Sequence, residues 1–177
     1  ANGDNGTFSF TSTIPSRNNF DITTSGGNGT TGAITIPTGT FDISEVVPTG
    51  WNLGTPSCTG ATTTVAKPKV TIVATTDANI VCTFTNTRQT ATLKVVKNVT
   101  AAGGVTDGNF NFTSNTSLGN FSLNTSGGTA STSIVTIPTG TYDISETVPS
   151  GWSLTGIGCT GTTPTVANPK VTINATE

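Results

Sequence analysis

The sequence has no histidine and no methionine, and only 9% of its 177 residues are charged. The missing histidine excludes the Ser/His/Asp and Cys/His arrangements of nucleophilic catalysis and the commonest side-chain ligand of transition metals. The acidic loops around Asp4 and Asp107 are too sparse to supply the roughly six to eight oxygen ligands of Ca²⁺. No glycine-rich loop followed by lysine is present to hold a phosphate group. We therefore expect no enzymatic activity, no metal and no cofactor.

Basic residues and long apolar runs are also scarce. Seven Lys and Arg stand against nine Asp and Glu, giving a net charge of -2, and the basic residues form no cluster of the kind that binds nucleic acid. No apolar run approaches the roughly 18 residues of a membrane span. Because the chain begins with alanine, we expect it to be a processed or excerpted part of a longer protein.

What the sequence does contain is one module written twice. The stretch IPTGTFDISEVVPTGW at residues 36–51 returns as IPTGTYDISETVPSGW at residues 137–152. More than half of the aligned positions from Phe20 onward are identical at this offset of 101 residues. An internal repeat of this length indicates tandem domains. We expect them at residues 1–89 and 90–177, with a linker of only a few residues.

Each module consists of short stretches with the alternation typical of β-strands. Phe41, Ile43 and Glu45 alternate with two polar residues between Pro-Thr-Gly turns, which indicates a half-buried strand. Similar strands are expected at residues 34–36, 69–75, 80–86 and 91–99, the last of them opening the second module. Many short strands separated by Gly and Pro turns predict an all-β fold, here two antiparallel immunoglobulin-like β-sandwiches stacked end to end.

The two modules differ in their first and last strands. The strand at residues 91–99 has no counterpart before Phe8, and the strand at residues 80–86 has no counterpart after Ile173 in the second module. Each module is therefore expected to lack one edge strand in this chain. Strand complementation by copies of the same chain, or by further repeats, would complete both.

The three cysteines fit the same scheme. Cys58 and Cys82 lie near strands of one small domain and suggest a disulfide and an oxidising compartment, with a pair of reduced core thiols as the alternative. Cys159 aligns with Cys58, so its partner is expected outside this chain.

The order of these strands resembles a known family. An opening LKVVK strand, a central GTYDISE strand followed by a P-x-G-W turn, and a closing CTFTN strand are similar to the prealbumin-like, collagen-adhesin B-type domains found in tandem in microbial surface proteins and pilins. Such domains often carry an isopeptide bond between a lysine on the first strand and an asparagine on the last, assisted by a buried acid on the central strand. The resemblance implies that Glu45 is the acid and Asn86 the acceptor in the first module, and that Lys97 is the amine and Glu146 the acid in the second.

Strand alternation places these polar groups on the inward face independently of the resemblance. Asn86 shares its parity with Cys82 and Phe84, and Lys97 shares its parity with Leu93 and Val95. Burial would favour a neutral amine, able to attack the amide carbon, and a protonated acid, able to polarise the amide oxygen. The alternatives are that these residues form a buried salt bridge or emerge into solvent at strand ends.

Two further groups of residues have a candidate role at the surface. Trp51 and Trp152 follow turns and could stack on sugar, although core packing is the expectation because aromatic side chains dominate core energetics. Eight N-x-Ser/Thr sequons could bear glycans. Four of them crowd into one segment, at Asn111, Asn115, Asn120 and Asn124.

Together these features favour a structural role over a catalytic one. We expect a repeat of an extracellular stalk or pilus-like filament on a microbial cell surface, joined by strand complementation and covalent crosslinks. The alternative is an adhesin module that presents a loop to a glycan or a protein as its surface ligand.

Overall fold

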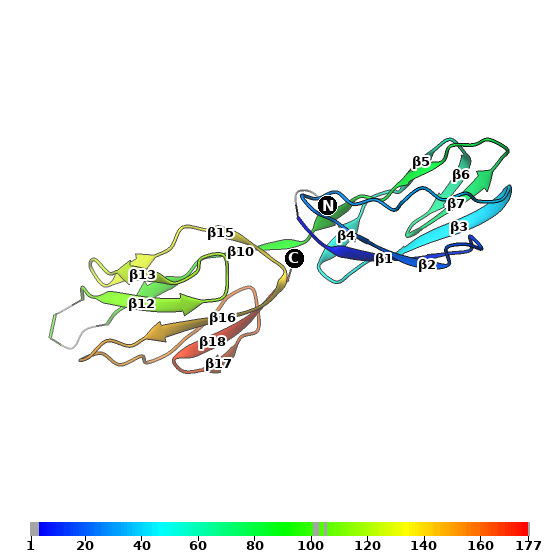
Figure 1. The fold of residues 1–177 in the computed structure, drawn as a ribbon. Helices are drawn as coiled ribbons and strands as arrows, with labels where there is room; N and C mark the ends of the chain where they lie inside the picture. The colour runs from blue at the N-terminus through cyan, green and yellow to red at the C-terminus, as the bar shows by residue number, and fades with distance from the viewer. Residues whose placement is uncertain (1–3, 101–102, 105, 177) are drawn as a thin grey trace. The chain divides into compact units, whose positions relative to one another are not determined.

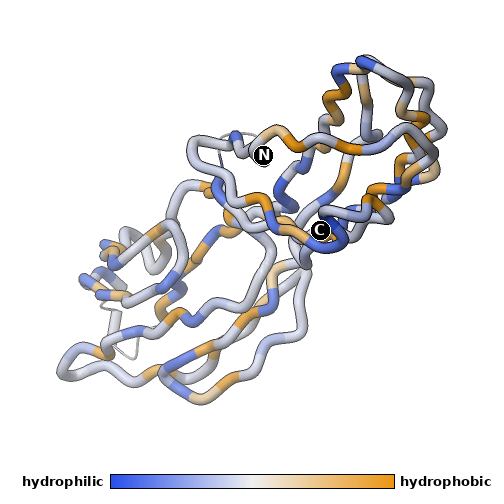
Figure 2. Tube along the Cα trace, turned by 45° about the vertical axis from the view of Figure 1, so that its right-hand side comes forward, coloured by the Kyte–Doolittle hydropathy of each residue, from blue (hydrophilic) through white to orange (hydrophobic). Residues whose placement is uncertain are grey.

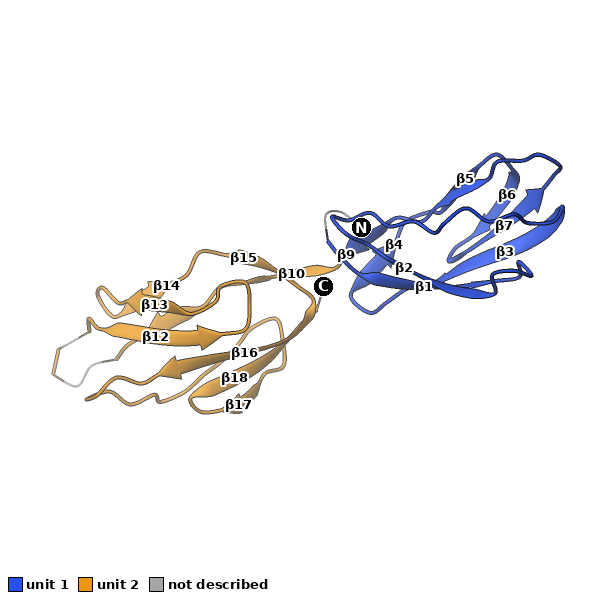
Figure 3. Cartoon of the chain, viewed as in Figure 1, with its two compact units in different colours: residues 1–88 blue, residues 89–177 orange. Residues whose placement is uncertain are grey.

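The computed structural model describes residues 4–100, 103–104 and 106–176 (Figure 1). The chain divides into two compact units, residues 1–88 and residues 89–177 (Figure 3). All the regular elements in the described ranges are β-strands, paired antiparallel. Those ranges contain no helix long and apolar enough to cross a membrane.

Unit 1 is built on one five-stranded antiparallel sheet and two short two-stranded ladders. The five-stranded sheet has the order β2-β1-β3-β7-β6, and the ladders are β4-β9 and β5-β8. Its strands are β1 (Thr7–Ser12), β2 (Asn19–Thr23), β3 (Gly39–Val46), β4 (Trp51–Leu53), β5 (Ser57–Thr59), β6 (Thr62–Ala66), β7 (Lys69–Ala74), β8 (Val81–Thr83) and β9 (Asn86–Arg88).

Unit 2 repeats the five-stranded sheet with the order β13-β12-β16-β18-β17. Its two ladders are different, because here β10 pairs with β15 and β11 pairs with β14. Its strands are β10 (Thr90–Leu93), β11 (Val96–Asn98), β12 (Asn109–Ser114), β13 (Phe121–Asn124), β14 (Thr129–Ser131), β15 (Val135–Pro138), β16 (Gly140–Thr147), β17 (Thr165–Ala167) and β18 (Lys170–Ala175).

The turn after each central strand is set by its proline and glycine. Pro48 O accepts a hydrogen bond from Trp51 N at 3.2 Å, and the equivalent bond in unit 2 runs from Trp152 N to Pro149 O at 3.1 Å. Gly50, between the bonded residues, has a φ of 81°, in the left-handed region that glycine enters without a Cβ clash. This turn delivers the tryptophan back onto the core of its own unit.

Alternating apolar residues of the strands form the cores. Phe8, Phe10, Trp51, Val70 and Ile72 are buried in unit 1, and the corresponding positions of unit 2 hold residues such as Phe110, Phe112, Val171 and Ile173. Along the trace in Figure 2, hydrophobic residues occur in short stretches separated by polar ones, as expected for strands with one buried face.

Three of the expected strands differ from the structure. The strand expected at residues 91–99 is divided into β10 and β11, which pair with the separate strands β15 and β14. Residues 34–36 were expected to form a strand, yet no strand is assigned between Gly29 and Thr38. In unit 2 the same segment is β15, which is held by β10, and no described residue plays the part of β10 beside residues 34–36. The expected strand at residues 80–86 is divided into β8 and β9, because its partner strands β5 and β4 are themselves separated by Gly54–Pro56.

Candidate functional site

The central strands β3 and β16 each place a glutamate inside the sandwich. Glu45 is 2% exposed and Glu146 is 7% exposed. Each stands opposite a core phenylalanine on the neighbouring strand, Phe10 and Phe112 respectively. The inward parity expected for both glutamates is therefore what the structure shows.

In unit 1 the glutamate is paired with the asparagine of the closing strand. Asn86 Nδ2 donates to Glu45 Oε1 at 2.7 Å, and Asn86 is 3% exposed. The other two oxygens, Glu45 Oε2 and Asn86 Oδ1, are buried and have no hydrogen-bond partner among the described residues. A carboxylate and an amide oxygen are both acceptors only, so this arrangement lacks donors. A proton on Oε2 or an incoming cationic donor would therefore supply a hydrogen bond that these oxygens lack.

Burial also acts on the acid itself. It raises the pKa of Glu45 above its ordinary value, and the hydrogen bond from Asn86 opposes that rise without cancelling it. The protonated acid can donate from Oε2, which supplies one of the missing donors. The environment of Glu45 thus favours the neutral carboxyl group.

In unit 2 the equivalent glutamate is paired with a lysine instead. Lys97 Nζ donates to both carboxylate oxygens of Glu146, at 2.7 Å and 2.8 Å. The side chains of this ion pair are only 11% and 6% exposed. The ammonium group also lies 4.4 Å from the centre of the Phe110 ring, in cation–π contact. Lys97 thus bonds the glutamate that corresponds to the partner of Asn86 in unit 1.

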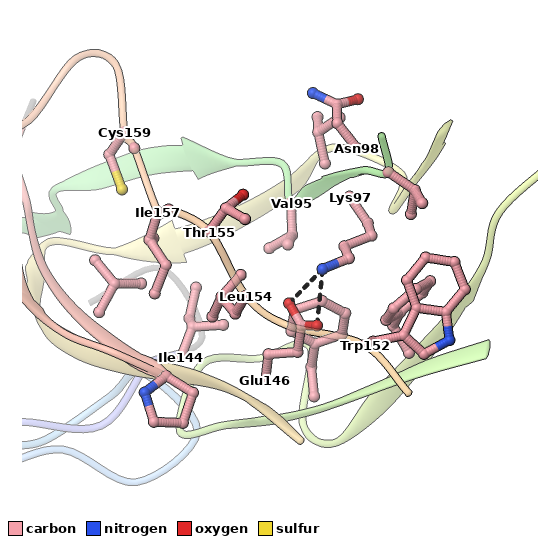
Figure 4. Close-up of a pocket in the computed structure, with 18 of the residues that line it drawn as sticks. Val95, Lys97, Asn98, Ile144, Glu146, Trp152, Leu154, Thr155, Ile157 and Cys159 are labelled. Carbon is pink, nitrogen blue, oxygen red and sulfur yellow. Dashed lines mark hydrogen bonds and ion pairs between the residues drawn. The ribbon is translucent and has the colours of Figure 1, made fainter. Parts of the chain in front are cut away.

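The Lys97–Glu146 pair lies in a groove of about 890 Å³. Figure 4 shows Lys97 and Trp152 toward one end of the groove and Cys159 toward the other, with Val95, Ile144 and Ile157 between them. Most of the lining side chains are apolar, so the groove is an uncovered part of the unit 2 core.

The groove lies between two backbone segments with open edges. On one side, β10 and β11 are paired only with β15 and β14 among the described strands. On the other side, residues 152–160 form no strand, although the equivalent residues of unit 1 form β4 and β5 by pairing with β9 and β8. Side-chain burial differs between the units in the same segment, since Leu53 is 4% exposed whereas the equivalent Leu154 is only partly buried. The groove therefore has the position that β8 and β9 fill in unit 1.

The cysteines follow the same contrast between the units. Cys58 and Cys82 form a disulfide that joins β5 to β8, as expected from the sequence. Cys159 is a free thiol that lines the groove, and its partial burial raises its pKa. Its expected partner outside the chain remains a prediction.

Other sequence candidates lie away from the groove or within the core. Asn111, Asn115, Asn120 and Asn124 are all exposed, and their glycosylation stays a prediction. Trp51 is 9% exposed and packs edge-on against Phe8, so its indole belongs to the core, as expected. Among the described residues, no group of three or more Cys, Asp or Glu side chains is placed to hold a metal ion.

Sequence reasoning missed one repeated polar cluster on the outer face of each sheet. Asp42 accepts from Thr71 Oγ1 at 2.5 Å and from Lys69 Nζ at 3.0 Å across β3 and β7. Asp143 has the same partners in unit 2, Thr172 and Lys170. The Thr hydroxyl, and then the Lys ammonium, hold the pKa of each aspartate below its ordinary value. The repeated D-x-S and K-V-T patterns were the available signal, but only strand register shows that they meet.

The chain matches the family model of the SpaA-type "prealbumin-like fold domain" twice, over residues 1–88 and 93–177. No curated protein and no solved structure matches the chain. The two matches cover nearly all of the sequence and fall on the two units of the structure. The chain belongs to the SpaA-type family of prealbumin-like fold domains and carries two of them in tandem.

Proposed function

We propose that this chain is a structural repeat of an extracellular stalk or pilus-like filament on a microbial cell surface, whose modules are joined by complementing strands and locked by Lys–Asn crosslinks. Membership of the SpaA-type prealbumin-like family supports the structural and surface role, since domains of this type are components of pilins and surface proteins. The family resemblance also supports the crosslink chemistry.

One observation carries the proposal. The same buried position of the central strand holds an acid–amide pair in unit 1, Glu45 with Asn86, and an acid–amine pair in unit 2, Glu146 with Lys97. Each pair is two thirds of the set that the crosslink needs. A module with both the opening and the closing strand would bring the amine, the amide and the acid to one buried point.

The chemistry at that point is a transamidation. The neutral Nζ attacks Cγ of the asparagine, the new C–N bond forms, the bond from Cγ to Nδ2 breaks, and ammonia leaves. The acid first polarises the amide oxygen and then carries a proton from the amine to the leaving nitrogen. No oxidant and no cofactor is consumed, and the module reacts once without turnover.

A covalent bond between the first and last strands suits a load-bearing filament. Pulling on the ends of a β-sandwich separates its terminal strands, and a bond between them must break before the module can extend. The Cys58–Cys82 disulfide is a second staple, which closes a loop over a sequence separation of 24 and contributes about 3 kcal/mol. The modules thus combine two kinds of covalent link.

The test is the intact mass of a chain that has been extended after residue 177 by the sequence of residues 77–88, which supplies unit 2 with a closing strand. We expect the reduced and denatured product to lack the mass of one ammonia, and fragment masses to join Lys97 to the added asparagine. Lys97→Arg is the matched control, because it keeps the charge but cannot form the amide product. A full mass for the extended chain at complete folding would contradict the crosslink.

The place of the protein is tested separately on natural material. Antibodies against the folded chain should label filaments or stalks outside the cell in electron micrographs. Labelling confined to the cell interior would refute the surface role, whatever the result of the mass measurement.

A further inference from the structure

The groove of unit 2 has a template for its occupant in unit 1. There, the segment of β8 and β9 lays three alternate side chains on the core: Cys82 bonds to Cys58, Phe84 meets Phe10 edge-on at 5.1 Å, and Asn86 bonds to Glu45. The backbone of this segment pairs with β5 and β4.

The counterparts of all three receiving groups are present in unit 2. Cys159 holds the position of Cys58, Phe112 that of Phe10, and Glu146 that of Glu45, and all three line the groove. Cys159 lies toward one end of the groove and Lys97 with Glu146 toward the other (Figure 4). The three groups therefore define both a direction and a register for a strand.

We propose, on the basis of the stalk function above, that the groove binds an extended strand with the sequence pattern of residues 80–86, and that a disulfide between Cys159 and the cysteine of that strand fixes its register. The strand runs antiparallel to residues 152–160, as β8 and β9 run against β5 and β4 in unit 1. Its phenylalanine packs on Phe112 and its asparagine faces the Lys97–Glu146 pair.

A strand fits the groove better than a compact ligand does. The groove offers open backbone edges along its length, and only an extended backbone can satisfy such edges. Two of its polar groups correspond to receiving groups of unit 1, the Cys159 thiol toward one end of the groove and the Glu146 carboxylate toward the other. In unit 1 the strand residues that meet the equivalent groups, Cys82 and Asn86, are four positions apart, about 13 Å in an extended strand.

The disulfide step is a two-electron oxidation of two thiols. Cys159 and the strand cysteine each lose a proton and together lose two electrons to a disulfide oxidant, which leaves as two thiols. Burial raises the pKa of Cys159, so the free groove reacts slowly with thiol reagents from solution. Docking compensates by raising the local concentration of the strand cysteine.

The experiment uses the full chain and a peptide with the sequence of residues 78–88, whose cysteine is activated as a mixed disulfide with pyridine-2-thiol. Thiol–disulfide exchange then needs no oxidant, because the thiolate of Cys159 attacks the peptide sulfur and pyridine-2-thione leaves. We expect thione release roughly tenfold or more faster than with an activated glutathione of equal concentration, from the effective concentration of the docked peptide. Peptide mapping should place the adduct on Cys159.

The sharpest control is a peptide of identical composition in which the residues at positions 82 and 83 exchange places, as do those at 86 and 87. This turns the cysteine and the asparagine to the opposite face of the strand, so its reaction should be as slow as that of activated glutathione. Leu154→Arg in the chain, at a partly buried groove position outside any strand, should slow the matched peptide to the same rate. Circular dichroism verifies that the variant is folded.

Equal rates for the matched and exchanged peptides on a folded chain would overturn the proposal. So would a dimer of the chain that protects Cys159 from both peptides, since a second copy would then cover the groove by another surface. The outcome is separable from the crosslink test, because the peptide can dock and form the disulfide whether or not ammonia is lost. A filament shown on the cell surface with no peptide preference would leave the stalk function intact and refute only this strand assignment.

Discussion

Replacing Glu45 with glutamine tests whether the buried site of unit 1 favours an uncharged side chain over a carboxylate. The glutamine oxygen keeps the hydrogen bond from Asn86 Nδ2. Its amide nitrogen takes the place of Oε2, which has no partner among the described residues, and adds a donor to a site where Asn86 Oδ1 also has none. Glu45→Gln therefore supplies permanently the hydrogen that the wild-type acid has only when protonated.

The magnitude follows from the cost of that proton. A carboxyl group with an ordinary pKa of 4.5 costs roughly 3 kcal/mol to keep protonated at about pH 7, at about 1.4 kcal/mol per pH unit. If the group ionises instead, each buried acceptor without a donor costs on the order of 1–3 kcal/mol. The variant avoids both costs, so its unit 1 should be more stable by about 2–3 kcal/mol near neutral pH.

The sign of the pH dependence is fixed by the direction of the shift. Because the pKa of Glu45 is raised in the folded unit, the stability that its protonated form contributes is fully present below about 4.5 and is lost as the pH rises through the folded pKa. Unit 1 of the wild type should therefore weaken on going from mildly acidic to neutral pH. The glutamine variant should show no such fall.

Urea unfolding followed by tryptophan fluorescence measures this directly. Trp152→Phe in both proteins leaves Trp51, in the unit 1 core, as the only reporter. Glu45→Ala serves as the control, because it removes the bond to Asn86 and leaves a cavity, so it should destabilise unit 1 at every pH. A glutamine variant less stable than the wild type at neutral pH would refute the inference that the site around Glu45 favours an uncharged side chain.

Four further outcomes are expected. Asp42→Asn should destabilise unit 1 at neutral pH, because the Thr71 hydroxyl and then Lys69 lower the pKa of Asp42 and so stabilise its ionised form. The wild type loses this stabilisation only as the pH falls below about 3.8, so the urea midpoints of the two proteins should converge at acidic pH. Replacing Cys58 and Cys82 with alanine should cost unit 1 about 3 kcal/mol and leave the Trp152 signal of unit 2 unchanged. Lys97→Met should destabilise unit 2 by about 3 kcal/mol by leaving a buried carboxylate unpaired, and adding Glu146→Gln should recover most of the loss in the same urea assay. Enzymatic removal of N-linked glycans should lower the mass of natural material at residues 111–124, and an unchanged mass would contradict glycosylation there.

The sequence predicts the buried glutamates well because the relevant physics is local. The parity of Phe41, Ile43 and Glu45 on one strand decides which face each side chain takes, and a turn at either end fixes the length of the strand. The second module repeats the same alternation, which gives the same prediction for Glu146. The disulfide was predictable for a similar reason, since both cysteines lie near strands of one small domain.

Strand pairing is harder to predict from the sequence, because the alternation of apolar and polar residues shows which face of a strand is buried but not which strand lies beside it. Residues 34–36 alternate like a strand, yet unit 1 as described holds no strand beside them. The sequence predicted that unit 2 lacks a strand, but it did not show which side chains line the resulting groove. That its thiol, ion pair and phenylalanine lie together follows only from the register of β12 and β16 and from the position of the segment after the P-x-G-W turn. The outer aspartate clusters were missed for the same reason.

The two units show the central acid in two electrostatic settings that the proposed crosslink must connect. Glu146 forms an ion pair with Lys97 at the side of an open groove, whereas burial favours a neutral Glu45 against the opposing effect of the hydrogen bond from Asn86. A closing strand in unit 2 would exclude water from the ion pair, and excluding water penalises a charged pair relative to a neutral one. A neutral pair holds the nucleophilic amine and the donating carboxyl group that the crosslink chemistry requires. The closing strand would therefore bring to unit 2 both the asparagine amide and the water-excluded surroundings that the proposed crosslink needs.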